Sequence, residues 1–169
     1  MATFPKLTRE LTNKLQAIVP SRDGGMLYYP CRVRLRNGSA IDHVYVSSVD
    51  RYLATWGVLP QDDAAKREVR VEELVDLEES PDRLPVHLAN ELYAAGESAM
   101  GGCFFELAFA DHSKQAYETG NAVDFLPLPP GKSWVDAVAV LPHQRGTLEN
   151  RLKGLPYSWC LFASTTEAV

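Results

Sequence analysis

The sequence has little cysteine, and its cysteines are far apart. Cys31, Cys103 and Cys160 form no CxxC pair, so the spacing typical of structural zinc sites and thioredoxin-like redox sites is missing. Each lies in an apolar or aromatic stretch, so we expect buried, reduced thiols and a cytoplasmic location. A disulfide-rich scaffold is excluded, and we expect no metal and no cofactor.

Long hydrophobic runs and an excess of basic residues are also missing. No run of about 18 apolar residues occurs, so we expect no segment that spans a membrane. Residues 1–14 lack the apolar core of a secretory signal. Seventeen basic residues against 22 acidic ones give a net charge of −5. This balance disfavours a general nucleic-acid binder, because such a protein needs basic surface to neutralise phosphates.

The common catalytic motifs are absent as well. The sequence holds no GxxxxGK[ST] phosphate loop, no GxGxxG fingerprint after a strand, no HExxH zinc motif and no GxSxG serine elbow. The histidines, at positions 43, 87, 112 and 143, are too widely spaced for a metal-ligand pattern. We therefore assign no catalytic residue. An enzyme would need a dispersed site that pairs Cys103 or a carboxylate with His43 or His112.

Strand patterns dominate what is present, and the clearest is a hairpin that begins at Cys31. Cys31, Val33 and Leu35 alternate with arginines, and the strong turn signal Asn37-Gly38 follows. A two-residue loop would put Asp42 on the apolar face, so we expect a three-residue loop at 37–39. That register pairs Leu35 with Ile41, Val33 with His43 and Arg34 with Asp42.

A second hairpin begins at Cys103, turns at 111–113 and returns over 114–119. Further strands are expected at 69–71, 75–78, 122–126, 137–141 and 157–163, and irregular structure at 48–67. Apolar spacing predicts one helix over 4–19, capped by Thr3. It predicts another over 83–95, capped by Asp82 and ended by Gly96.

Together these patterns predict an α+β fold: a mostly antiparallel β-sheet from two hairpin-led units, with two short helices. The strand order resembles that of SH3-like or Sm-like small barrels in pattern only. The two cysteine-led hairpins suggest a pseudo-duplicated pair, and two unrelated hairpins are the alternative. We expect one compact domain over 1–169. The alternative is a split into 1–82 and 83–169, each holding a helix and a β-unit.

Charged and aromatic clusters supply the candidate binding residues. Arg32, Arg34 and Arg36 form a basic stripe on one strand face, and a run of carboxylates follows at 72–82. We interpret this run as an exposed acidic edge rather than a cation site. Tyr52 and Trp56 lie in the irregular segment and can anchor a partner or cover a core. The candidates are Tyr52, Trp56, Arg32, Arg34, Glu72, Asp76 and Glu78.

These observations favour a cytoplasmic protein-interaction or regulatory domain without catalytic activity, of the inhibitor or immunity type. Its expected partner is another protein, not a membrane, and its oligomeric state is open. The alternative is the enzyme with a dispersed site. A third hypothesis is a module for single-stranded nucleic acid, because Tyr29 and Tyr45 accompany the basic stripe.

Overall fold

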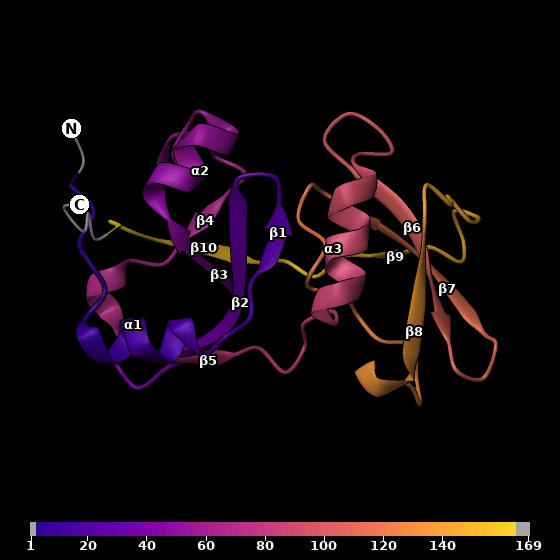
Figure 1. The fold of residues 1–169 in the computed structure, drawn as a ribbon, viewed down its shortest axis with the longest axis horizontal. Helices are drawn as coiled ribbons and strands as arrows, with labels where there is room; N and C mark the ends of the chain where they lie inside the picture. The colour runs from indigo at the N-terminus through magenta and orange to yellow at the C-terminus, as the bar shows by residue number, and fades with distance from the viewer. Residues whose placement is uncertain (1–2, 165–169) are drawn as a thin grey trace. The chain divides into compact units, whose positions relative to one another are not determined.

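The computed structural model describes residues 3–164, which form two compact units. Unit 1 takes the chain up to Pro81 and again from Tyr157, and unit 2 is Asp82–Pro156. Unit 2 therefore interrupts the sequence of unit 1, as the colours of Figure 1 show. Both units contain mostly antiparallel sheets and short helices, so the predicted α+β class is confirmed. Whether the chain behaves as one domain stays a prediction.

Unit 1 is built on a six-stranded sheet in the order β1-β2-β3-β10-β4, with β5 also paired to β2. Strand β10 runs parallel to its neighbours β3 and β4, and the other pairings are antiparallel. The elements are α1 (Arg9–Gln16), β1 (Ser21–Asp23), β2 (Met26–Leu35), β3 (Ala40–Ser48), α2 (Val49–Trp56), the 3₁₀ turn η1 (Pro60–Asp62), β4 (Arg67–Glu68), the 3₁₀ turn η2 (Val71–Glu73), β5 (Leu74–Glu79) and β10 (Ser158–Phe162).

Unit 2 has a four-stranded sheet in the order β8-β6-β7-β9, in which β9 runs parallel to β7. Its elements are α3 (Val86–Ala95), β6 (Cys103–Phe109), β7 (Lys114–Thr119), the 3₁₀ turn η3 (Trp134–Asp136), β8 (Ala137–Pro142) and β9 (Leu152–Lys153). Within residues 3–164 no pairing joins the two ends of either sheet, so the small-barrel resemblance finds no support in the strand pairing.

The two units share one strand plan. In each, a central strand (β2 or β6) pairs with the next strand (β3 or β7) and with a later one (β5 or β8) that follows a 3₁₀ turn. A last strand (β10 or β9) then joins in parallel. The registers correspond: Cys31 lies between Val44 and Glu79, as Phe105 lies between Tyr117 and Pro142. The repetition that the two cysteine-led hairpins suggested is therefore present in the strand topology of the two units.

The hairpin turns correspond in atomic detail. The N–H of Leu35 donates to the Ser39 carbonyl at 2.8 Å, and that of Phe109 donates to the Ser113 carbonyl at 2.9 Å. The third turn residue is left-handed in both, with φ 86° at Gly38 and 68° at His112. A side-chain oxygen of Asn37 or Asp111 accepts from the serine N–H in each turn.

The predicted register of the first hairpin is wrong. Its three-residue loop spans 36–38 rather than 37–39, so Val33 faces Ile41 and Arg34 faces Ala40. A β-bulge then places Asp42 and His43 opposite the single residue Arg32. The bulge residue His43 has φ 59°, and the extra residue keeps the inward side chains of both strands on the core side.

Helix α2 is the main element that the pattern missed, because 48–67 was expected to be irregular. Ser48 caps it, accepting from the Arg51 N–H at 3.4 Å, and left-handed Gly57 ends it. Several shorter expectations are corrected too. Thr8 rather than Thr3 caps α1, and Pro85 rather than Asp82 precedes α3. The strand expected at 69–71 is not formed, since Val69 and Arg70 are irregular and Val71 begins η2. Residues 122–126 hold only an isolated bridge at Phe125.

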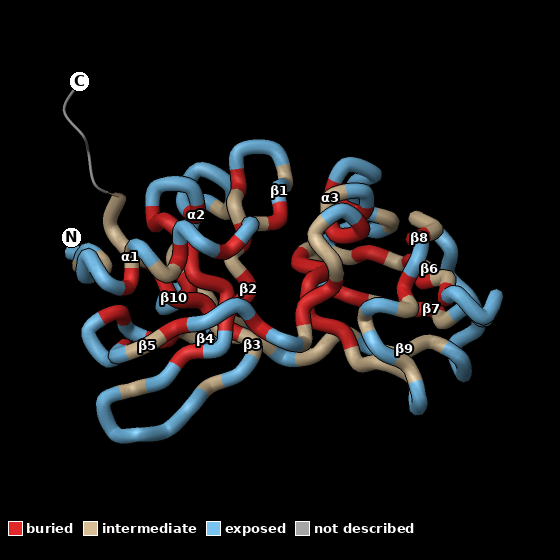
Figure 2. The backbone as a smooth tube through the Cα atoms, turned by 60° about the horizontal axis from the view of Figure 1, so that its bottom comes forward, coloured by how far each residue is buried: buried red, intermediate tan, exposed pale blue. Residues whose placement is uncertain are grey.

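The core of unit 1 has an aliphatic part and an aromatic part, and Figure 2 shows buried segments along β2, β3 and β10. Leu11 and Leu15 of α1 pack on Val33, Leu77 and other aliphatic side chains of the sheet. Trp159 of β10 centres the aromatic part, with ring centroids 4.9 Å from Tyr52, 5.1 Å from Tyr45 and 5.9 Å from Tyr28. Since Trp159 arrives on the last strand, the core of unit 1 is complete only when β10 is in place.

Candidate functional site

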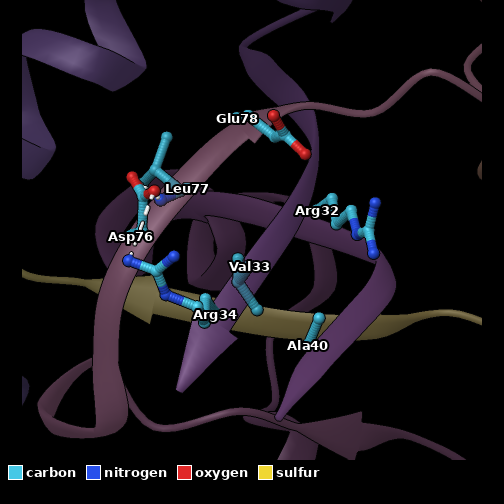
Figure 3. A pocket seen from close by; sticks show the side chains of 7 residues that line it. All are labelled: Arg32, Val33, Arg34, Ala40, Asp76, Leu77 and Glu78. Atoms are coloured by element: carbon cyan, nitrogen blue, oxygen red, sulfur yellow. Dashed lines mark hydrogen bonds and ion pairs between the residues drawn. The ribbon is translucent and has the colours of Figure 1, made fainter. Parts of the chain in front are cut away.

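The outer face of β2, β3 and β5 carries a charged groove, a surface hollow of about 220 Å³. Figure 3 shows the side chains that line it. They are Arg32, Val33, Arg34, Ala40, Asp76, Leu77 and Glu78. The groove thus holds four residues that the sequence singled out for binding, two from the basic stripe and two from the acidic run.

Strand register explains why these charges meet. Arg32 faces Glu78 and Arg34 faces Asp76 directly across the antiparallel β2–β5 pair. Between them Val33 faces Leu77, and both are buried, because alternate residues of a strand point to opposite faces. Two cations of one strand therefore oppose two anions of the next. Such cross-strand pairs stabilise a sheet by roughly 0.2–1 kcal/mol each.

Of the two acids in the groove, Asp76 has the larger number of charged partners. Its carboxylate accepts from Lys14 Nζ of α1 and lies 3.8 Å from Arg34 Nη2. The hydrogen bond from Lys14 is the main reason that the pKa of Asp76 is lowered, and the same bond raises the pKa of Lys14. Lys14 also lies 3.5 Å from Glu10 one helical turn earlier. Asp76 is therefore ionised at neutral pH.

The other acid of the groove has an open carboxylate. Arg32 turns away from Glu78, and its Nε lies 3.0 Å from Asp42 Oδ1 on β3. Glu78 is exposed, and its side chain forms no hydrogen bond or ion pair within the part of the chain that the structure describes. The dashed line between charged groups in Figure 3 accordingly joins Arg34 and Asp76, not Arg32 and Glu78. The groove keeps unused acceptor atoms at one end.

Glu72, the remaining acidic candidate, lies outside the groove. It belongs to η2, and its Oε1 is 3.5 Å from Arg70 Nη2. Its backbone carbonyl accepts from Arg36 Nε at 2.7 Å, which ties η2 to the first hairpin turn. It lines a separate hollow of about 460 Å³ with Glu68 and Arg70. The structure therefore does not bring Glu72 together with Asp76 and Glu78.

The two aromatic candidates lie on α2, with different exposure. Tyr52 is fully buried against Trp159, and this burial raises the pKa of its hydroxyl. Lys66 Nζ donates to that hydroxyl at 3.1 Å and lies 4.7 Å from the centre of the Trp56 ring. Trp56 is half-buried. The ring of Tyr52 is thus part of the core, and only Trp56 has surface to offer a partner.

The arginine stripe is not accompanied by the exposed aromatic rings that a binding surface for single-stranded nucleic acid needs. Tyr45 is fully buried, with its ring 4.9 Å from that of Tyr157 and 5.1 Å from that of Trp159. Tyr29 is half-buried and lines a different hollow from the one that holds the arginines. Base stacking requires an exposed ring face. Arg32 and Arg34 are also next to carboxylates of Asp42 and Asp76. These surroundings suit a partner that carries charges of both signs.

The thiols and histidines supply little for catalysis. All three cysteines are buried and none is in a disulfide, and burial raises the pKa of Cys160 to about 12. A nucleophilic thiol needs the opposite, an accessible site and a lowered pKa. His112 is exposed in the second hairpin turn. Among residues 3–164 there is no group of three or more His, Cys, Asp or Glu that could hold a metal ion.

Unit 2 contains one serine–histidine contact that the sequence did not indicate. Ser98 Oγ lies 2.8 Å from His143 Nδ1, and His143 Nε2 lies 3.1 Å from the Ala95 carbonyl. Ser98 Oγ also accepts from the Phe104 N–H and lies within hydrogen-bond reach of the Phe104 carbonyl. The hydroxyl is therefore occupied in joining the loop after α3 to β6. No spacing in the sequence could have shown this contact, because it joins residues 45 positions apart.

No protein-family model, curated protein sequence or solved structure matches the chain. In the part of the chain that the structure describes, none of the helices has the length and apolar character needed to cross a membrane. The function of the charged groove must therefore be argued from its own geometry.

Proposed function

We propose that the chain is a protein-interaction or regulatory domain without catalytic activity, and that its binding surface is the charged groove of unit 1. The observation that carries the proposal is the pair of opposed charged rows on one exposed sheet face. Arg32 and Arg34 lie on β2, and Asp76 and Glu78 lie directly across on β5.

The groove suits a binding role because its charges are ordered but incompletely paired. The side chains of Arg32 and Arg34 are 46% and 59% exposed, so both guanidinium groups keep donors available to a partner. Exposed ion pairs are weak, typically under about 1 kcal/mol, so a partner can replace them at little cost. Complementary charges across an interface mainly set specificity and association rate. A protein segment fits this pattern if it places an acidic side chain against the arginines of β2 and a basic side chain against the carboxylates of β5.

Two properties of the whole chain, the state of its thiols and its net charge, agree with a cytoplasmic regulatory protein. None of its thiols is in a disulfide, as expected for a protein kept in a reducing compartment. The net charge of −5 favours basic or mixed-charge partners over nucleic acid. An inhibitor or immunity role, in which the domain blocks another protein, is the form of this function that we favour.

A charge-swap variant tests the proposal. Arg32→Glu with Glu78→Arg keeps the net charge and leaves opposite charges at two facing positions. It reverses the order of charges in the groove and replaces the Arg32–Asp42 ion pair with two like charges. Affinity capture from the native lysate identifies proteins held by the wild-type chain, and calorimetry measures each interaction. We expect the swap to weaken binding at least about tenfold, which corresponds to about 1.4 kcal/mol. Binding of the wild type should also weaken as salt is raised from 0.1 to 0.5 M, since salt screens exposed charges.

A matched control is available in unit 2. Glu106→Lys with Lys114→Glu exchanges the same kinds of charge on β6 and β7 and should leave binding unchanged. A partner that the groove swap and this control retain equally well contradicts the proposal. A partner that nuclease treatment releases would favour the single-stranded nucleic-acid hypothesis instead.

A further inference from the structure

Unit 1 contains a further hollow, of about 260 Å³, that shares no residue with the charged groove or with the hollow beside Glu72. Its walls come from the segment before α1, from α1 itself, from β2, from the start of α2 and from the end of β10. The residues that decide its chemistry are Lys6, Leu7, Leu15, Tyr29, Arg51 and Phe162.

The floor of this hollow is apolar and incompletely covered. Leu15 is buried, whereas Leu7, Tyr29 and Phe162 are only half-buried although they pack on the core. Their open surfaces face the same cavity. Covering apolar surface is favourable by roughly 25 cal/mol per Å², so these side chains offer a place for a hydrocarbon or aryl group.

The charged residues of the wall are all cations. Lys6 and Arg51 line the hollow, and no aspartate or glutamate does, although the whole chain carries a net charge of −5. Arg51 Nη1 donates to the Gly25 carbonyl at 2.7 Å, which holds the side chain in place and leaves its other donors open. Lys6 forms no ion pair or hydrogen bond with another residue in the stretch 3–164.

We propose that this hollow binds a small monocarboxylic acid with an aryl or short alkyl body. The carboxylate meets Arg51 and Lys6, and the body covers Leu7, Tyr29 and Phe162. A neutral apolar molecule would leave both cations without an anion, and an amine would be repelled. The hollow, at about 260 Å³, is smaller than the roughly 300–1,000 Å³ of pockets that hold drug-sized ligands, so we expect a smaller ligand than those.

Chemical-shift mapping with 3-phenylpropionate on the isotope-labelled full chain tests the proposal. We expect the backbone amides of Leu7, Gln16 and Arg51 to shift together and to saturate with a Kd at or below about 1 mM. The neutral analogue 3-phenylpropanamide should bind at least about tenfold more weakly, because it cannot form charge-assisted hydrogen bonds. The amine 2-phenylethylamine should not bind at this site.

Three variants locate the site. Arg51→Gln and Lys6→Gln should each weaken binding at least about fivefold. Gln16→Trp should block it by filling the hollow from an exposed position on α1. Arg9→Gln removes an exposed cation from α1 outside the hollow and should change the Kd by less than about twofold. An unchanged amide spectrum confirms that each variant is folded.

Three results would overturn the proposal. The first is the absence of saturable shifts at 20 mM 3-phenylpropionate. The second is equal binding of the acid and its amide, which would remove the role of the two cations. The third is a set of shifts centred on the charged groove or on unit 2.

Discussion

Unit 1 and unit 2 follow one strand plan, yet the outer faces of their sheets differ in chemistry. The positions of Arg32 and Glu78 in unit 1 correspond by register to Glu106 and Leu141 in unit 2. The positions of Arg34 and Asp76 correspond to Ala108 and Ala139. One backbone arrangement thus carries four charges in one unit and a single charge in the other.

The comparison separates what the fold requires from what a function adds. Inward positions are apolar in both units, for example Val33 and Leu77 in one and Leu107 and Val140 in the other. Because the sheet of unit 2 forms without the opposed charges, these charges are not needed for the strand plan. They are therefore the best candidates for a role in recognition.

The largest expected difference between the units concerns their last strands. Trp159 on β10 corresponds by register to Lys153 on β9, which is exposed. Trp159→Ala removes the centre of the aromatic core and should lower the free energy of unfolding by about 3–5 kcal/mol. Lys153→Ala should change it by less than about 0.5 kcal/mol. Urea denaturation followed by circular dichroism measures both, and equal effects would contradict the assigned roles of the two strands.

The corresponding hairpin turns provide the next test. Gly38 and His112 are both left-handed, a conformation that costs a residue with a side chain about 1 kcal/mol relative to glycine. A Cβ at Gly38 would meet no atom within 4 Å, so only the backbone conformation opposes a substitution. We expect Gly38→Ala to destabilise by about 1 kcal/mol and His112→Gly to stabilise by about 0.5 kcal/mol. Thermal unfolding of both variants checks the opposite signs; two changes of the same sign would contradict the equivalence.

A smaller effect, expected in both units, concerns acid conditions. Asp76 has a lowered pKa because Lys14 donates to it, and Asp111 of unit 2 has one because Lys132 does. An acid with a lower pKa in the folded state stabilises above its unfolded pKa, about 3.9, and this contribution is lost as the pH falls through the folded pKa. Asp76→Asn should therefore flatten the decline of stability below about pH 4. Carboxyl NMR titrations that place either pKa at or above 3.9 would contradict the contacts with lysine.

The smallest expected effect on stability is at Arg34. Its guanidinium is exposed and 3.8 Å from Asp76, so Arg34→Ala should alter the free energy of unfolding by less than about 0.5 kcal/mol. The reciprocal change in unit 2, Ala108→Arg, should be equally mild. Calorimetry of a captured partner should nevertheless show weaker binding for Arg34→Ala and unchanged binding for Ala108→Arg. A large loss of stability from Arg34→Ala would mean that the groove is structural.

The sequence predicted most of the strands because alternation is a local signal. The hairpin at Cys31 and the strand near Val75 were found this way, and the helix ended by Gly96 was found from its apolar spacing. Helix α2 was missed although its signals were local too: Val49, Tyr52 and Trp56 are spaced for one face, and Ser48 and Gly57 cap its ends. Gly57, Pro60 and the run Gln61-Asp62-Asp63 favoured an irregular segment instead.

Other features depend on contacts that no local pattern carries. The bulge at Asp42 and His43 shifts the register because the strand has one residue more than its partner needs. The parallel pairing of β10 with β3 joins segments more than a hundred residues apart. The charged groove was predicted in part. The basic stripe and the acidic run could be recognised in the sequence, but only the β2–β5 register shows which charges face one another.

The interruption of unit 1 by unit 2 has a consequence for the chain as it leaves the ribosome. Strand β5 ends at Glu79 and β10 begins at Ser158, so a ribosome adding about 5–20 residues per second needs roughly 4–16 s to pass from one to the other. Hairpins form in microseconds. Unit 2 therefore has its whole sequence available while unit 1 still lacks β10, and the space for Trp159 between β3 and β4 stays open. Pulse proteolysis of a chain that ends at Pro156 should find unit 2 protected and unit 1 cleaved.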